Sequence, residues 1–313
     1  MPEHFRQTGD SMQSNLTKLL KRLAPLNVRE DMEMRALTSI RIGGRALAFV
    51  EPKTLEELLL ALNAARDCDI KPFLMGNGTN LLINDSGLDR LVIRIGEAFS
   101  YARKTEAGIE AGAGMLLSDL CRTAATLGMA GIEWASGIPG SVGGALAMNA
   151  GAYNGEIKDY VCRVDYMENG EFFSVRPNVD DFSYRKSAYA APNRIVLAAE
   201  FALTSDDSAA IFARIDDFSR RRAEKQPLEY PSAGSVFKRP VGHYAGALIE
   251  TAGMKGAKNG GAQVSEKHAG FIINTGDATF QDVLGLIRMV QKRVYETSGV
   301  TLETEIKIIE AES

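Results

Sequence analysis

Apolar residues recur along the chain at two spacings, which predict helices and strands in alternation. Leucines at helical spacing between Leu16 and Leu23 predict a short amphipathic helix that ends near Pro25. A second helix begins at Thr54, because Thr54 and Glu57 form a capping box and leucines then recur on one face.

Short aliphatic and aromatic runs predict the strands. Ala46–Val50 and Pro72–Met75 flank the helix that begins at Thr54, so this region is expected to form a strand, helix, strand unit. A hairpin turn at Glu168-Asn169-Gly170 indicates that antiparallel sheet is mixed in. The further strands that we expect are Leu81–Ile83, Leu91–Ile95, Ile109–Ala111, Val161–Met167, Glu171–Val175, Ile195–Leu203 and Leu302–Ile309.

Longer helices are expected later in the chain. Met115–Leu127 ends at a capping glycine, Gly128, and Thr279–Ser298 has a continuous apolar face. Asp206–Lys225 is the third, and it carries the basic triplet Arg220–Arg222 near its C-terminal end. Such a triplet complements the negative end of a helix dipole, or it contributes to a site.

Glycine-rich segments lie between these elements. Ala135–Gly151 combines glycines with small side chains, and Gly76–Asn80 lies between two apolar runs. Glycine lets backbone approach a ligand closely and lets N–H groups converge on an anion. Two such loops could hold one diphosphate between them, although a tight loop packed under a helix would share this composition.

The composition is that of a globular protein. With 313 residues, of which 45% are hydrophobic and 24% charged, the chain can form two or three domains. A net charge of −4 without a basic stripe or tail argues against a nucleic-acid or anionic-membrane partner. No apolar run approaches the ~20 residues of a membrane span, and the first residues lack the pattern of a signal peptide. We therefore expect a cytoplasmic protein without membrane insertion.

Several kinds of site are disfavoured. Cys68, Cys121 and Cys162 are far apart within apolar patterns, so we expect buried free thiols, and the three histidines add no metal-ligand spacing. We expect no metal. The chain also lacks a G-x-G-x-x-G fingerprint, a phosphate-binding P-loop and a G-x-S-x-G nucleophile motif.

Blocks of sequence between Thr38 and Ile309 resemble the UDP-N-acetylenolpyruvoylglucosamine reductases of peptidoglycan synthesis. Each block alone is a weak match, but together they occur in the order of the family, which makes the resemblance specific. The first thirty residues match nothing in the family pattern. The blocks are Thr38–Gly44, Gly76–Leu82, Ser136–Ala145, Asn149–Tyr153, Tyr184–Ser187, Gly234–Lys238 and Gly253–Gly256.

The resemblance implies an α+β fold in which two subdomains hold FAD, in the manner of the vanillyl-alcohol-oxidase (PCMH-type) flavoproteins, and a third domain holds a UDP-sugar. It implies that NADPH reduces FAD, and that the flavin then reduces UDP-N-acetylglucosamine enolpyruvate to UDP-N-acetylmuramate. We expect a monomer. The expected parts are a helical segment 1–36, an FAD-binding region 37–225 that divides near residue 100, a substrate domain 226–301 that follows a proline-punctuated boundary, and a C-terminal strand 302–313.

Three catalytic positions follow from the resemblance: Ser235, Arg185 and Glu305. Reduction of the enolpyruvyl double bond needs an acid for one carbon and cations for the adjacent carboxylate. Arginine offers a planar fork for that carboxylate. The period of a strand places Glu305 on the face opposite its aliphatic neighbours, which is either solvent or the site.

Simpler structural roles remain open for the other two positions. Ser235 is also a suitable turn residue after Gly234, and Arg185 has potential ion-pair partners in Asp180 and Asp181.

The resemblance also implies binding residues. FAD would be held without a covalent bond, since no histidine occurs between His4 and His243 and the cysteines lie outside the glycine loops. The FAD-binding positions are Gly76, Asn77, Gly78, Thr79, Asn80, Leu81, Ser136, Gly137, Ile138, Pro139, Gly140, Ser141, Gly143 and Gly144. The substrate-binding positions are Lys225, Arg239, Lys255 and His268.

The chain departs from the family pattern at Asn77, Arg239 and Thr304, where glycine, asparagine and proline are common. The short stretch between Ser187 and Lys225 predicts the compact form of the enzyme, without an extra substrate-covering loop. Two alternatives remain: an oxygen-using oxidase of the same fold, and a nucleotide-sugar-binding regulator without chemistry.

Overall fold

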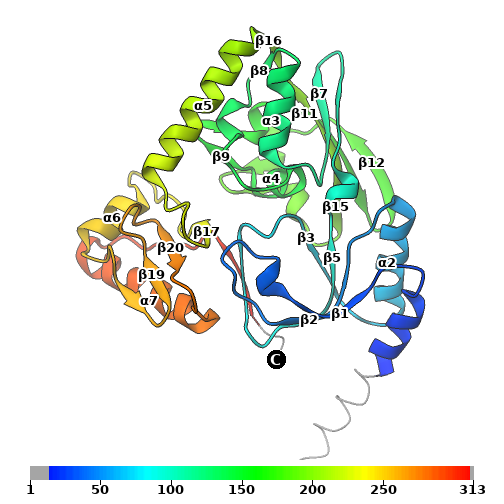
Figure 1. Cartoon of the computed structure of the whole chain (residues 1–313), viewed down its shortest axis with the longest axis horizontal. Coiled ribbons are helices and arrows are strands. Elements are labelled where there is room, and N and C mark those ends of the chain that lie inside the picture. Colours follow the sequence, from blue (N-terminus) through cyan, green and yellow to red (C-terminus); the bar gives the residue numbers. More distant parts are fainter. Residues whose placement is uncertain (1–13, 311–313) are drawn as a thin grey trace, which may run out of the picture.

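The computed structural model describes residues 14–310, which form three parts (Figure 1). Residues 1–13 and 311–313 lie outside the described range. The prediction about a signal peptide concerns these first residues, and the predicted parts 1–36 and 302–313 are described only from residue 14 and up to residue 310. Residues 14–22 are helical, as predicted, and Leu19 and Leu23 are fully buried in the same core as the first long helix.

The first part is a mixed four-stranded sheet in the order β1-β2-β5-β3. Helix α2 (Leu55–Asp67) connects β2 to β3, which confirms the predicted strand, helix, strand unit. Thr54 caps α2 by accepting the N–H of Glu57, while the Glu57 carboxylate accepts the N–H of Lys53, one residue before the position that a capping box requires. The strands are β1 (Arg29–Glu33), β2 (Arg45–Val50), β5 (Leu88–Arg94) and β3 (Pro72–Met75).

The second part is an antiparallel five-stranded sheet with helices packed on it (Figure 1). The predicted hairpin joins β11 to β12, with Asn169 and Gly170 both at positive φ. Asp207 caps α5 by accepting the N–H of Ala210. The strands, in sheet order, are β12 (Glu171–Val175), β11 (Val161–Glu168), β15 (Arg194–Ala202), β7 (Gly108–Gly112) and β6 (Ala102–Lys104), and the helices are α3 (Leu117–Thr126), α4 (Val142–Met148) and α5 (Ser208–Lys225).

The third part contains a four-stranded antiparallel sheet in the order β17-β20-β19-β18 and helices α6 and α7. Thr279 and Gly299 end α7 as predicted, through a capping box and a left-handed cap. Ile40, Ile42 and Leu82 also belong to this core, although they precede it by far in the chain. The elements are β17 (Ser232–Ser235), α6 (Ala245–Thr251), β18 (Lys258–Asn259), β19 (Ala262–Val264), β20 (Phe271–Asn274) and α7 (Phe280–Ser298).

The prediction of a strand over Leu302–Ile309 is wrong for most of that range. Only β21 (Lys307–Ile309) is a strand, and it pairs in parallel with β4 (Leu81–Ile83). Residues 303–305 instead bond to residues 236–238, through Lys238 N–H to the Glu303 carbonyl and Glu305 N–H to the Val236 carbonyl. The segment changes partner between two parts of the molecule, so no single ladder extends along it.

Short elements complete the described chain. Helices α4 and α6 were not predicted, because their small and glycine-rich sequences have weak helical patterns. Between Ser187 and Lys225 lie β15, β16, α5 and a short 3-10 helix, in agreement with the predicted compact form. The remaining short strands are β8 (Met129–Ala130), β9 (Gly151–Ala152), β10 (Gly155–Glu156), β13 (Phe182–Ser183), β14 (Lys186–Ser187) and β16 (Thr204–Ser205), and the 3-10 helices are Met34–Ala36, Glu97–Phe99, Glu133–Ala135, Ile157–Asp159, Val179–Asp181 and Ala188–Ala190.

Candidate functional site

The two glycine loops meet. Gly76 follows β3, and a Cβ at this position would lie 2.5 Å from the hydroxyl oxygen of Ser141, which caps α4. The Asn77 amide donates to the Pro139 carbonyl at 2.6 Å, so the residue that departs from the family pattern ties the loops together. Glycine at 76 is therefore needed for the close approach of the two segments.

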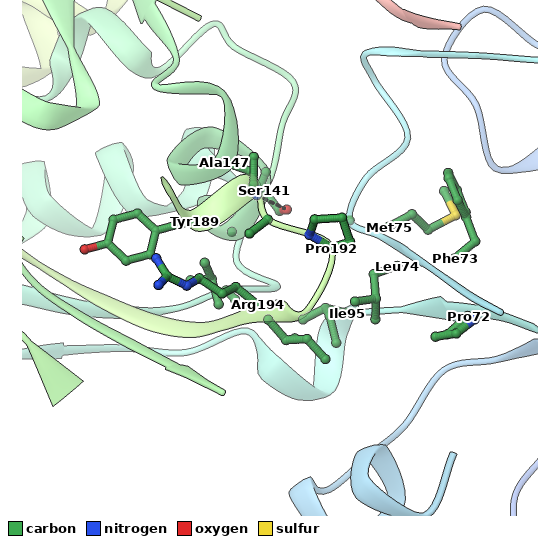
Figure 2. Close-up of a pocket in the computed structure, with 18 of the residues that line it drawn as sticks. Pro72, Phe73, Leu74, Met75, Ile95, Ser141, Ala147, Tyr189, Pro192 and Arg194 are labelled. Carbon is green, nitrogen blue, oxygen red and sulfur yellow. Dashed lines mark hydrogen bonds between the residues drawn. The ribbon is translucent and has the colours of Figure 1, made fainter. Parts of the chain in front are cut away.

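Two cavities open on either side of this contact, and both are lined by Gly76 and Ser141. The larger, about 390 Å³, lies between β3, α4 and the segment from Tyr189 to Val196 (Figure 2). The smaller, about 290 Å³, is lined by residues that include Gly96 and Gly114. The two cavities therefore share part of their lining at the contact between the glycine loops.

Part of the second loop already uses its backbone donors within the protein. Ser136, Ile138 and Val142 donate to backbone carbonyls, as does Gly143, and the N–H of Gly144 donates to the Ser141 hydroxyl. Pro139 has no N–H to donate. The N–H groups that this loop can offer to a diphosphate are therefore those of Gly137, Gly140 and Ser141.

Arg185 and Glu305 form an ion pair at 2.9 Å, with 17% and 16% of their side chains exposed. Arg185 lies in the turn between β13 and β14 at a φ of 57°, a conformation that is uncommon for a non-glycine residue. Its Nη2 donates to the Gly151 carbonyl at 2.9 Å. No hydrogen bond is described for Nη1 within residues 14–310, so one arm of the guanidinium is available to a ligand.

Glu305 is held between the other parts of the site. Its N–H donates to the carbonyl of Val236, the neighbour of Ser235, and its carbonyl accepts from the Asn80 amide of the first glycine loop. Burial raises the pKa of the Glu305 carboxyl above its usual value, although the nearby Arg185 and Lys238 act to lower it. The side chain is therefore shielded from solvent and turned toward Arg185, so it does not lie on a solvent-exposed face.

Ser235 ends β17 after Gly234, which has a φ of 80°. Within the described residues its hydroxyl has no hydrogen-bond partner. A Cβ at Gly270 would lie 3.4 Å from the Ser235 hydroxyl and 2.9 Å from Cε1 of His268, so serine and histidine lie around the same glycine. The structure thus holds Ser235 beside the backbone partner of Glu305, with its hydroxyl free to contact a ligand.

The four predicted substrate-binding residues have different surroundings. Arg239 stacks on Tyr244, with its guanidinium carbon 3.9 Å from the ring centroid, and its N–H donates to the Tyr184 hydroxyl beside Arg185. Lys225 is exposed at the end of α5, and Lys255 pairs with Glu250 at 2.9 Å.

His268 is half-buried, and its Nδ1 accepts the N–H of Gly270 at 3.1 Å. Burial lowers the pKa of its imidazole, so the ring is neutral near pH 7. Of the four substrate-binding candidates, Arg239 is tied most directly to the Arg185–Glu305 pair.

Sequence reasoning missed buried polar groups at the seam between α5 and the second glycine loop. The basic triplet was expected either to complement the helix dipole or to contribute to a site, without Arg222 being singled out. Ser136 was expected to bind FAD, and Gln226 was expected at the domain boundary. The available signal was the helical period, because Arg222 continues the inward face that carries Ile211, Ile215 and Phe218.

Thiols, metals and membrane spans add no further site. The predicted free thiols are confirmed, with Cys68 and Cys121 buried and Cys162 partly so. Among residues 14–310 no group of three or more histidine, cysteine or acidic side chains could hold a metal. No helix in this range has the length and apolar character needed to cross a membrane.

Comparison with known proteins relates most of the chain to one enzyme family. The family model described as "UDP-N-acetylenolpyruvoylglucosamine reductase, C-terminal domain" matches residues 226–309, and the one described as "FAD binding domain" matches residues 46–174. Proteins named UDP-N-acetylenolpyruvoylglucosamine reductase include one from Alkaliphilus oremlandii, 44% identical over 294 residues, with 93% of this chain and 97% of the relative covered. One from Clostridium botulinum is 45% identical over 288 residues, with 92% and 94% covered.

A solved structure agrees. The crystal structure of the reductase from Thermus caldophilus matches with a TM-score of 0.79 and 35% identity, covering 91% of this chain and 99% of that one. The predicted α+β fold, with an FAD-binding part followed by a C-terminal domain, is thereby confirmed.

Proposed function

Because this chain belongs to the UDP-N-acetylenolpyruvoylglucosamine reductase family, we propose that it uses NADPH to reduce UDP-N-acetylglucosamine enolpyruvate to UDP-N-acetylmuramate in the cytoplasm. It is an FAD-dependent oxidoreductase. The observation that carries the proposal is the half-buried Arg185–Glu305 pair, held between Ser235 and the first glycine loop.

The glycine loops, with the cavities on either side, would hold FAD without a covalent bond. FAD, when bound, supplies the two-electron redox chemistry that no amino-acid side chain here can provide. The residues that we assign to it are Gly76–Leu81 of the first loop, and Ser136–Ser141, Gly143 and Gly144 of the second. They act as a cradle in which small residues and a few free N–H groups approach the diphosphate.

Arg185 would bind the carboxylate of the enolpyruvyl group through its free Nη1. Charge builds up on that carboxylate as the double bond is reduced, and a positioned cation stabilises it most when water is excluded. Nε and Nη2 stay bonded to Glu305 and the Gly151 carbonyl, so the guanidinium cannot turn away. The rare backbone conformation of Arg185 is consistent with a functional constraint.

Ser235 would give its proton to the substrate carbon. Its hydroxyl has no competing partner in the described structure, and it is partly shielded from water by its position in β17. Glu305, whose pKa is raised, would stabilise the same enolic species by sharing a proton with it.

The UDP portion would contact Lys225, Arg239, Lys255 and His268. Arg239 is the best placed, because stacking on Tyr244 fixes its guanidinium without using a carboxylate. Lys255 must exchange Glu250 for the diphosphate. The neutral His268, whose Nδ1 accepts the Gly270 N–H, can donate one hydrogen bond from Nε2.

Rapid mixing tests the proposal. Purified protein loaded with FAD should be bleached by NADPH, and UDP-N-acetylglucosamine enolpyruvate should then restore the flavin absorbance far faster than air. Faster reoxidation by oxygen than by the enolpyruvyl substrate would favour an oxidase. A colourless protein that binds no added FAD but binds UDP-sugars would favour a binding regulator.

A further inference from the structure

Arg222 is a cation without a counterion in the described part of the chain. It lies one residue after Arg221, whose guanidinium pairs with Asp217 at 2.6 Å, and two after Arg220, which pairs with Asp217 and Glu224. For Arg222 itself, residues 14–310 supply neither a hydrogen bond nor an ion pair. The basic triplet therefore contains two exposed, paired arginines and one that turns inward.

The inward side chain lies against the second glycine loop. A Cβ at Gly137 would lie 2.7 Å from Cδ of Arg222 and 3.5 Å from its Nη1, so glycine is needed here to admit the arginine. Burial lowers the pKa of this guanidinium, and only the hydroxyl of Tyr153 acts in the opposite direction. The side chain is half-buried, and a cation that is partly removed from water without a partner destabilises a folded protein.

Other unsatisfied atoms lie at the same seam. Ser136, the residue before Gly137, has a buried hydroxyl oxygen with no hydrogen-bond partner, and the side-chain oxygen of Gln226 is also buried and unpaired. Gln226 is one helical turn beyond Arg222, and its N–H donates to the Arg222 carbonyl at 2.9 Å. Native proteins satisfy nearly all such buried groups, so their concentration here indicates a missing ligand.

We infer that Arg222 and Ser136, assisted by the amide of Gln226, bind phosphate oxygens of a nucleotide diphosphate at the seam between α5 and the second glycine loop. The guanidinium supplies the charge and a planar pair of donors, and the serine hydroxyl supplies a further donor. A half-turn of the Gln226 side chain would present its NH₂ group. This inference rests on the proposed function, which supplies two such ligands, FAD and the UDP-sugar.

The test compares Arg222→Gln with the control Arg221→Gln, which removes an exposed, paired arginine from the same helix. Flavin-free protein is titrated with FAD and with riboflavin, which lacks phosphate, and binding is followed by flavin fluorescence. FAD-loaded protein is titrated with UDP and with uridine, and binding is followed by the flavin difference spectrum.

We expect Arg222→Gln to weaken the binding of one diphosphate ligand by about 10- to 100-fold, which is the effect of losing a charged hydrogen bond. The matching phosphate-free ligand should bind as before, and Arg221→Gln should leave both unchanged. A loss confined to FAD assigns the seam to the cofactor, and one confined to UDP assigns it to the substrate. Ser136→Ala should weaken the same ligand, by a smaller factor.

Thermal unfolding separates ligand binding from a structural role. Removing this unpaired, half-buried charge should leave the melting temperature of the ligand-free protein unchanged or raise it, while the stabilisation by the diphosphate ligand should shrink. Three results for Arg222→Gln would overturn the inference. They are a lowered melting temperature without ligand, an equal loss of affinity for FAD and riboflavin, and affinities that match those of Arg221→Gln. Failure of the parent protein to bind FAD would instead contradict the proposed function.

Discussion

Arg185 and Glu305 are 120 positions apart in the chain, yet the guanidinium Nε lies 2.9 Å from the carboxylate Oε1. Arg185 comes from the hairpin of the second part and Glu305 from the segment that joins the third part to β4. Neither Asp180 nor Asp181 is paired with Arg185 in the described structure. The pair thus connects parts of the molecule that must stay together for the proposed chemistry, and removing either member leaves a poorly solvated charge.

Arg185→Lys should keep the positive charge but lose the fork that contacts Glu305, the Gly151 carbonyl and the substrate together. We expect reoxidation of the flavin by the enolpyruvyl substrate to slow by roughly 10²-fold, the loss typical of one stabilising donor. Bleaching by NADPH should change little. Stopped-flow absorbance measures both rates, and Lys186→Gln, at the exposed neighbouring position, is the control. An unchanged reoxidation rate would remove Arg185 from the proposed role.

Ser235→Ala removes one hydroxyl group and should slow only one of the two half-reactions. If the hydroxyl protonates the substrate carbon, reoxidation by substrate should fall by about 10²–10⁴-fold. Reduction by NADPH should stay close to the parent rate, because the serine takes no part in it. Normal reoxidation would exclude serine as the acid, whereas equal losses in both half-reactions would point to damage at the flavin site. Ser232→Ala, at the other end of β17, serves as the control.

Glu305→Gln should change how stability depends on pH. Burial raises the pKa of Glu305 above 4.5, so the folded protein binds this proton more tightly than the unfolded chain does. Its contribution to the free energy of unfolding is complete below pH 4.5 and decreases as pH rises through the folded pKa. Glutamine cannot titrate, so the variant should gain stability relative to the parent over this window.

Urea unfolding at a series of pH values measures that difference. Glu303→Gln, two residues earlier with 72% of its side chain exposed, is the control and should show no comparable trend. A relative stability of Glu305→Gln that decreases as pH rises would mean that Arg185 outweighs burial and that the pKa is lowered instead.

Glu110→Gln should destabilise the fold without altering flavin chemistry. The Glu110 carboxylate is buried in β7 and contacts Arg103 at 2.6 Å, Arg163 and the Tyr101 hydroxyl at 3.0 Å. Loss of one member of such a buried group costs about 3 kcal/mol. The exposed Glu171, in the same sheet, supplies the control Glu171→Gln.

The stability that Glu110 contributes depends on pH with the opposite sign to that of Glu305. Burial acts to raise the pKa of Glu110, but the hydrogen bonds from Arg103 and Tyr101, with the charges of Arg103 and Arg163, outweigh it and lower the pKa. The stability that Glu110 contributes is therefore present above pH 4.5 and is lost as pH falls through the folded pKa. The gap between parent and Glu110→Gln should close in acid, and a gap that widens there would refute this account.

Gly78→Ala should cost several kcal/mol, although Gly78 lies in the proposed cofactor loop. Its φ is 66°, and a Cβ would lie 2.0 Å from the Leu37 carbonyl oxygen, a backbone atom that cannot move alone. Gly170 also has a positive φ, of 88°, but has open space around it, so Gly170→Ala should cost only about 1 kcal/mol. Chemical denaturation of both variants separates steric overlap from backbone strain, and equal losses would contradict the close approach of Leu37.

The helices and most strands could be predicted because their signals are local. The capping residues Thr54 and Thr279, and the Asn169-Gly170 turn, act within a few positions of the chain, so pattern and structure agree there. Helix α4 was missed because its glycines have low helix propensity, and packing under the five-stranded sheet overrides that preference. The prediction of one strand at Leu302–Ile309 was wrong because the backbone partners of this segment belong to two different parts of the molecule.

The sequence by itself determined the family and the kind of cofactor, because motifs preserve residue type and order, and it predicts Ser235, Arg185 and Glu305 as catalytic positions. Only the tertiary structure decided that Arg185 pairs with Glu305 rather than a nearby aspartate, and that the Glu305 side chain is shielded from solvent. It also decided that Arg222, alone of its triplet, is half-buried and has no counterion within residues 14–310. These outcomes depend on which distant segments exclude water from a side chain, and that burial, which sets both charge pairing and pKa, is a property of packing rather than of local pattern.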